Sequence, residues 1–216
     1  MDMVSGVGVL DKVAAVWRAL ENAGSLSLAD LTVATGIPRA TLHRLAVAME
    51  SQGLVRRNPQ GEFCLGWWLV SLGQSAEASF PLVALARPVL ERLRDTTGES
   101  VQLYVREADA RRCVVSFEST HGLRWIVPEG ALLPLSAGSA GHVLSGTPPN
   151  RRGWVASVGE REAGVASVSA PVRTSDGTVR AAISVSGPIE RLSSEPGKRY
   201  GAAVVNAAAD VAALIG

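Results

Sequence analysis

Apolar residues recur at every third or fourth position in three stretches of the first fifty residues, which predicts three amphipathic helices. The apolar face of the first helix consists of Leu10, Val13, Val16, Trp17 and Leu20. Ser27 is suited to cap a short second helix, which Gly36 ends. Pro38 is suited to the first position of the third helix. The inward face of that helix consists of Leu42, Leu45, Ala46 and Met49.

A strand, a turn and a second strand are predicted after the third helix. Residues 54–57 and 62–65 have the pattern of short strands, and residues 58–61, Asn-Pro-Gln-Gly, favour a turn between them. A β-hairpin directly after a helix-turn-helix is a wing, so we predict a winged helix-turn-helix domain over residues 1–66. Residues 67–80 are again helical in pattern and end before Pro81, which predicts a linker helix.

The rest of the chain, residues 81–216, is predicted to be an α+β domain around an antiparallel sheet. A helical pattern runs from Leu82 to Gly98, in which Pro88 either kinks the helix or starts a second one. Alternating apolar and polar residues predict strands over 101–107, 113–118, 165–173 and 178–186. The last two strands meet at Asp176-Gly177, a strong hairpin signal. An amphipathic helix over 200–214 closes the chain.

Composition narrows the classes of function. The 216 residues are 47% hydrophobic with a net charge of +1, which is typical of a globular protein and gives no global sign of nucleic-acid binding. No long apolar run and no signal-like N-terminus occur, so we expect a cytoplasmic protein without membrane contact. The spacing of Cys64 and Cys113, and of the three histidines, fits neither a disulfide framework nor a metal site. We therefore expect no metal and no cofactor.

The outward face of the third helix is small, polar and basic. Between residues 39 and 57 four arginines face a single Glu50, and phosphate contacts depend on such local charge. The major groove of DNA accepts one α-helix. We therefore expect the exposed side chains at the start of the third helix to contact the bases. These candidates are Arg39, Ala40, Thr41, His43 and Arg44. Arg56 and Arg57 on the wing would reach a phosphate or the minor groove, with exposed strand charge as the alternative.

Two features of the second domain are candidates for ligand binding. The small residues 136–141 are predicted to form a loop that leads into a helix. Their backbone N–H groups would bind an anionic ligand. The alternative is that this loop only packs against the sheet. Ser184 and Ser186 project from one face of a strand, so their hydroxyls would bind a carboxylate. The alternative is that these serines only reflect the alternation of polar and apolar residues in an exposed strand. No catalytic residues are predicted, because the sequence around Ser139 and His142 lacks a nucleophile elbow and a third triad member.

Five segments in this order make the chain resemble regulators of the IclR family from end to end. They are Gly8–Lys12, Ile37–Leu45, Phe63–Gly66, Thr97–Ser100 and Ala181–Pro188. A narrower resemblance, carried by Gly8–Lys12 and Gly159–Arg173, is to actinobacterial regulators of amino-acid metabolism, especially of leucine biosynthesis.

The resemblance implies a DNA-binding transcription regulator, more often a repressor, that binds a palindromic operator as a homodimer or a dimer of dimers. It also implies a GAF-like C-terminal domain that binds a small effector, such as a carboxylate or an amino acid, on its sheet. It places Glu160 and Glu162 at a wall of the pocket. The alternative is that both are charged surface residues in contact with solvent. The full set of candidate effector residues is Ser136, Ala137, Gly138, Ser139, Glu160, Glu162, Ser184 and Ser186.

The chain departs from the family pattern between Gly146 and Gly153, where relatives carry a longer and partly helical stretch. Two hypotheses follow. The first is a regulator whose operator binding is modulated by a small metabolite. The second is a DNA-binding protein with a degenerate sensor domain that binds no ligand and serves to dimerise or to recruit a partner. Thermal unfolding with amino and keto acids would separate them.

Overall fold

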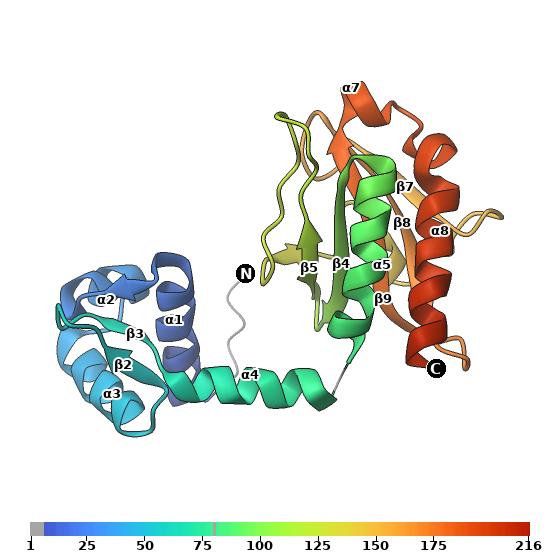
Figure 1. Cartoon of the computed structure of the whole chain (residues 1–216). Helices are drawn as coiled ribbons and strands as arrows, with labels where there is room; N and C mark the ends of the chain where they lie inside the picture. Colours follow the sequence, from blue (N-terminus) through green and yellow to red (C-terminus); the bar gives the residue numbers. More distant parts are fainter. Residues whose placement is uncertain (1–6, 80) are drawn as a thin grey trace. The chain divides into compact units, whose positions relative to one another are not determined.

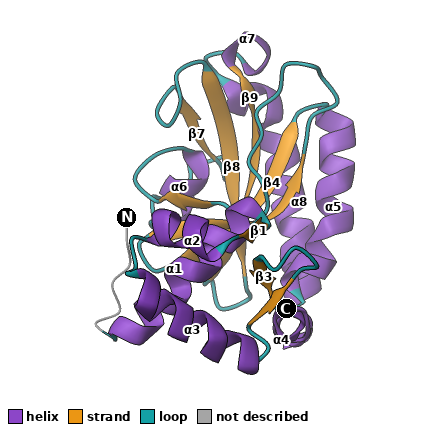
Figure 2. Ribbon diagram, turned by 90° about the vertical axis from the view of Figure 1, so that its left-hand side faces the viewer, coloured by secondary structure: helices purple, strands orange, loops and turns teal. Residues whose placement is uncertain are grey.

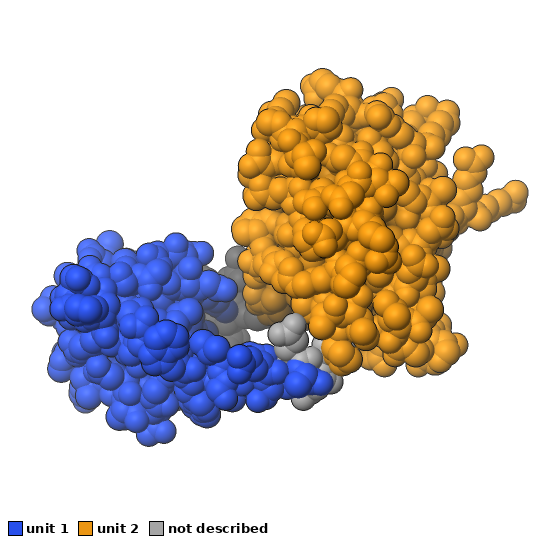
Figure 3. Space-filling model, viewed as in Figure 1, with its two compact units in different colours: residues 1–79 blue, residues 80–216 orange. Residues whose placement is uncertain are grey.

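The computed structural model describes residues 7–79 and 81–216, which fall into two compact units on either side of position 80 (Figure 3). The first unit contains helices α1 (Gly8–Ala23), α2 (Leu28–Thr35), α3 (Arg39–Ser51) and α4 (Trp67–Ser79). Its small antiparallel sheet has the order β1-β3-β2 and consists of β1 (Ser25–Leu26), β2 (Val55–Arg57) and β3 (Phe63–Leu65). The predicted winged helix-turn-helix is confirmed.

Local signals explain how α2 and α3 are delimited. The Ser27 hydroxyl accepts a hydrogen bond from the backbone N–H of Asp30, and Gly36 ends α2 in the left-handed conformation, as predicted. Pro38 lies one residue before the helix instead of at its first position. The core beneath these helices includes Leu31, Leu42 and Phe63, each almost fully buried. One face of α3 is therefore fixed by packing.

The second unit is built on a six-stranded antiparallel sheet of order β6-β5-β4-β9-β8-β7 (Figures 1 and 2). Its strands are β4 (Ser100–Glu107), β5 (Ala110–Phe117), β6 (Leu132–Pro134), β7 (Val155–Val158), β8 (Val165–Arg173) and β9 (Val179–Pro188). Its helices are α5 (Leu82–Thr97), α6 (Ser139–Leu144), α7 (Ile189–Leu192) and α8 (Pro196–Ile215). The predicted α+β class is confirmed.

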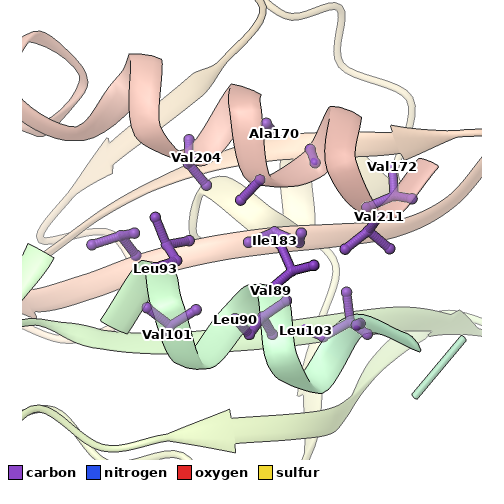
Figure 4. Packing of buried hydrophobic residues seen from close by; sticks show 14 of the residues in the cluster. Val89, Leu90, Leu93, Val101, Leu103, Ala170, Val172, Ile183, Val204 and Val211 are labelled. Carbon is purple, nitrogen blue, oxygen red and sulfur yellow. The ribbon is translucent and has the colours of Figure 1, made fainter. Parts of the chain in front are cut away.

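The two long helices α5 and α8 lie side by side on one face of this sheet (Figure 1). The close-up in Figure 4 shows Val89, Leu90 and Leu93 of α5 and Val204 and Val211 of α8 directed at the strands. Pro88 lies inside one continuous helix, so the alternative of two separate helices is wrong. Helix α6 packs on the opposite face of the sheet, against Tyr104 and Ala182.

Several boundaries differ from the sequence predictions. Strand β5 begins at Ala110 instead of residue 113, because the hairpin turn is only two residues long. Helix α6 begins at Ser139, so the small residues 139–141 belong to the helix and not to a loop. Strands β1, β6 and β7 and helix α7 were not predicted; each has four residues or fewer, too short for a periodic pattern.

Candidate functional site

The outward face of α3 is exposed. Arg39, Ala40, His43 and Arg44 are all exposed, whereas Thr41 is half-buried. The opposite side of the helix is locked into the core by Leu42, Ala46 and Met49, which are at most 2% exposed. The predicted candidates on this helix therefore lie together on the exposed part of α3 and its first turn.

The polar side chains on this face have no partners among the described residues. Within the described part of the chain, Arg39, His43 and Arg44 form no ion pair and no side-chain hydrogen bond. The first turn of α3 holds no acidic residue and has no side-chain cap, so its N–H groups lack the anion that a helix N-terminus favours. A phosphate group would satisfy both the amides and the cations.

The two wing arginines have partners within the unit. Arg56 is half-buried and stacks on the Trp67 ring, with its Cζ 4.9 Å from the ring centroid. Arg57 forms an ion pair with Glu50 of α3, with 3.2 Å between Nε and Oε2, and stacks on Phe63. Arg57 is exposed, so a phosphate would compete with Glu50 for its guanidinium.

The turn of the wing is stabilised by hydrogen bonds around Glu62. Its carboxylate accepts hydrogen bonds from the Ser25 hydroxyl at 2.7 Å and from the Asn58 side-chain amide at 2.9 Å. These two bonds lower the pKa of Glu62, the one from Ser25 contributing most. The Asn58 Oδ1 also accepts hydrogen bonds from the backbone N–H groups of Gln60 and Glu62, and these bonds stabilise the turn.

Small polar side chains cover the face of the second sheet that α5 and α8 leave free. Strand pairing sets Ser100 opposite Ser186, and Ser186 opposite Ser167. The next row sets Gln102 opposite Ser184, and Ser184 opposite Ser169. Because paired residues of neighbouring strands share a face, these side chains form one polar surface, and most of them are almost fully buried.

Helix α6 is attached to this polar surface by hydrogen bonds. The Ser139 hydroxyl, which is fully buried, lies 2.7 Å from the hydroxyls of both Ser167 and Ser169. The Gly138 N–H donates to the Glu160 carboxylate at 3.0 Å, and His142 Nε2 lies 2.6 Å from the same carboxylate. Partial burial alone would raise the pKa of Glu160, but these hydrogen bonds outweigh it and lower the pKa. The Gly138 N–H is therefore already hydrogen-bonded to Glu160.

The structure therefore brings most of the candidate effector residues together, with two exceptions. Gly138, Ser139 and Glu160 are linked through α6, and Ser184 and Ser186 lie on the adjoining strand of the same face. Ser136 and Glu162 are exposed, and within residues 7–79 and 81–216 no side-chain hydrogen bond or ion pair joins either to the rest. Ala137 contributes its carbonyl oxygen to the side chain of Arg111.

Arg111 was not predicted as a site residue, although it is 3% exposed. Its Nη1 donates to the carbonyl oxygens of Pro134 and Ala137, and its guanidinium stacks on the Tyr104 ring. Burial lowers the pKa of Arg111. A signal existed in the sequence, since alternation places Arg111 on the same face of β5 as the buried Cys113.

Metal binding, reactive thiols and membrane-spanning helices have little support among the described residues. In the described ranges, no three His, Cys, Asp or Glu side chains cluster as a metal site would require. Both cysteines are buried thiols, and burial raises the pKa of Cys113 to about 12. Neither described range contains a helix with the length and apolar character needed to cross a bilayer.

Three packed helices, of which the third is exposed and basic, followed by a wing define a winged helix-turn-helix DNA-binding protein. Residues 9–59 match the model of the IclR helix-turn-helix domain, and residues 74–152 and 149–213 match that of the bacterial transcriptional regulator IclR C-terminal domain. The chain belongs to the IclR family of bacterial transcriptional regulators.

Curated relatives and solved structures agree with this assignment. The transcriptional repressor IclR of Escherichia coli is 27% identical over 93% of this chain and 86% of its own length. The repressor AllR of the same species is 25% identical over 98% and 91%. An IclR homologue from Microbacterium hydrocarbonoxydans, solved with 4-hydroxybenzoate, has a TM-score of 0.78 at 22% identity, covering 95% of this chain and 98% of that one. A regulator from Alicyclobacillus acidocaldarius has a TM-score of 0.77 at 20% identity, with coverages of 97% and 99%.

The comparison also bears on the segment between Gly146 and Gly153. The C-terminal family model matches in two pieces, which meet at residues 149–152. The alignment to the E. coli repressor is 237 positions long, more than the 216 residues of this chain, so the relative carries residues that this chain lacks.

Proposed function

We propose that this protein is a repressor that inserts α3 into the major groove of a palindromic DNA operator and responds to a small metabolite. The observation that carries the proposal is the two-sided character of α3. Its inward side is locked by Leu42 and Met49, whereas its outward side presents unpaired cations. A recognition helix needs both properties, because rigid placement makes base contacts specific.

Each candidate DNA residue has a role that fits its chemistry. Arg39 and Arg44 are suited to donate paired hydrogen bonds to guanine or to hold phosphates. Thr41 and His43 would contact base edges or the backbone, and the small Ala40 lets the helix approach closely. Arg57, and Arg56 from its stacked position, would contact phosphates beside the groove.

A palindromic operator calls for two copies of α3, and α4 offers a surface for self-association. Four large apolar side chains of this helix are between 43% and 72% exposed. They are Trp67, Trp68, Val70 and Leu72. Soluble proteins seldom leave so much apolar surface on one helix uncovered. We therefore infer a homodimer, or a dimer of dimers, that uses α4.

The second unit would sense the metabolite on its polar sheet face. We assign residues 1–66 to DNA binding, 67–80 to the linker and 81–216 to sensing, with the sensor shortened around 146–153. The effector residues would be those of the α6 segment, Glu160, Ser184 and Ser186, with Ser136 and Glu162 at the rim. The homologue with 4-hydroxybenzoate supports a carboxylate as the effector.

The narrower resemblance to regulators of leucine metabolism makes amino acids and keto acids the first compounds to test. As a regulator of bacterial transcription the protein would act in the cytoplasm, where its DNA lies, and it would perform no catalysis of its own. Ligand binding would alter the relative placement of the two copies of α3, and therefore their fit to both half-sites. A protein that binds DNA but no ligand would instead fit the hypothesis of a degenerate sensor.

DNA binding is tested by selecting bound duplexes from a random pool and measuring their affinity for the full chain. The variant with both Arg39→Ala and Arg44→Ala should lose about 10- to 100-fold in affinity and should discriminate less between sequences. Arg18→Ala on α1 removes an exposed cation of the same unit and should bind normally. Unchanged affinity in the double variant, or no enrichment by the wild type, would refute the proposal.

A further inference from the structure

Among the described residues of the second unit, three buried side-chain N–H groups have no acceptor. They are Nε2 of Gln102, on the polar face of β4, Nε1 of Trp125 and Nε of Arg111. Gln102 is 1% exposed, and its Oε1 accepts a hydrogen bond from the Ser186 hydroxyl at 2.8 Å, so the amide is oriented and only its N–H end is unpaired. A buried donor without an acceptor is costly, which makes such groups informative.

The donors of Gln102 and Trp125 belong to one region of the sheet. The Trp125 carbonyl oxygen accepts a hydrogen bond from the Ser100 hydroxyl at 2.7 Å. Ser100 is two residues before Gln102 on β4, so both side chains project from the same face. The Trp125 ring also packs against the cluster that contains Tyr104, the next residue of this face.

Two guanidinium groups stack on aromatic rings of this region. The Arg161 Cζ is 4.6 Å from the centroid of the Trp125 ring, and the Arg111 Cζ is 5.3 Å from that of Tyr104. Burial is the main reason that the pKa of Arg111 is lowered; Tyr104 opposes this shift and the charge of Arg161 adds to it.

No carboxylate neutralises these cations. In the described ranges neither Arg111 nor Arg161 forms an ion pair, and Arg111 uses its Nη1 for two backbone carbonyls while its Nε is buried without an acceptor. Glu160, the neighbour of Arg161 in sequence, is already engaged with Gly138 and His142. The region thus has unpaired donors and unpaired positive charge.

We propose that this region is the anion subsite of the ligand pocket, in which Gln102 and Trp125 donate hydrogen bonds to a ligand carboxylate and Arg161 supplies the charge. The inference rests on the proposed function, because it names the ligand class and the specificity-determining residues of the same pocket. The subsite requires acceptors, since the unpaired atoms are all donors. A carboxylate supplies up to four acceptor positions and one negative charge, and a flat apolar body would pack on the Trp125 and Tyr104 rings.

The test compares acids with amides of the same shape. Thermal unfolding of the full chain is measured with benzoate against benzamide and with propionate against propionamide. The acids should raise the melting temperature with increasing concentration, and the amides should not, because an amide brings an N–H group to a site without a free acceptor. Arg161→Gln should abolish the response to acids.

Two substitutions remove single donors. Trp125→Phe keeps an aromatic ring without its N–H, and Gln102→Leu keeps the volume without the amide. Each should weaken binding of the acid that binds best by about 10- to 100-fold, as expected for one hydrogen bond to a charged group. Arg92→Gln is the matched control, because it removes an exposed guanidinium from α5 on the other face of the sheet.

Three outcomes would overturn the inference: equal stabilisation by amides, acid binding by Arg161→Gln as strong as by the wild type, or no stabilisation by any acid at millimolar concentration. DNA binding by the same preparations is measured in parallel with the selected duplexes. Retained DNA binding without a response to acids refutes the anion subsite alone. Loss of DNA binding by the wild type refutes the proposed function itself.

Discussion

At the scale of single residues, the wing shows how an intramolecular ion pair sets the availability of a cation. Arg57 pairs with Glu50 while the side chains remain 41% and 34% exposed. An exposed pair of this kind contributes at most about 1 kcal/mol to stability, so a phosphate oxygen is able to displace Glu50. If Arg57 contacts DNA as proposed, Glu50 would compete with a phosphate for its side chain.

Glu50→Gln should consequently strengthen DNA binding without loss of stability. In the wild type Glu50 and a phosphate would share Arg57, whereas in the variant the phosphate alone would hold it. The slope of log affinity against log salt should therefore become steeper, by up to about one. Fluorescence anisotropy of a labelled duplex at several salt concentrations measures both quantities. If the slope stays unchanged, or if Glu50→Gln combined with Arg57→Ala binds as tightly as Glu50→Gln alone, the competition does not exist.

At the scale of elements, Trp154 attaches the short connection before β7 to α8. The Asn150 carboxamide oxygen accepts the Arg152 and Trp154 N–H groups, which closes the turn. The indole then lies against the backbone of α8 at Gly197 and Gly201, one helical turn apart, where any Cβ would overlap the ring. Two glycines inside a helix are unfavourable by themselves, so the contact explains why they are present.

Gly201→Ala should therefore destabilise the protein, although alanine is the better helix former. The added Cβ would overlap Nε1 of Trp154, and displacing a packed indole costs about 1–3 kcal/mol. Thermal or urea unfolding of the second unit measures the change. The same substitution in a Trp154→Ala background should be neutral or stabilising. Equal effects in both backgrounds would show that the indole is not responsible.

At the scale of the whole molecule, the proposed dimer makes the exposed helix α4 important for DNA binding. Leu72→Asp should weaken self-association by at least about tenfold, since it places a charge among the apolar side chains of that helix. Affinity for a palindrome should fall with it, because the two half-sites would be bound independently. Analytical ultracentrifugation and anisotropy measure the two effects. Val33→Asp places the same charge at an exposed apolar position of α2 and should associate normally. A dimer that persists in Leu72→Asp would exclude α4 from the interface.

Sequence alone determined the features that arise from local interactions. The caps at Ser27 and Gly36, the inward face of α3 and the hairpin at Asp176-Gly177 depend on residues within a few positions of one another, so periodicity and turn chemistry predict them. The fold class followed, because the alternation of helical and strand patterns restricts the possible layers.

Only the tertiary structure decided which polar side chains meet. Gln102, Trp125 and Arg161 have no common pattern in the sequence, and strand pairing and chain reversal bring them to one face of the sheet. The partners of Glu50 and Glu160 were equally invisible, since each lies on a different element. Hydrogen-bond satisfaction is a property of the packed chain, so an unpaired buried donor has no meaning until every neighbour is in place.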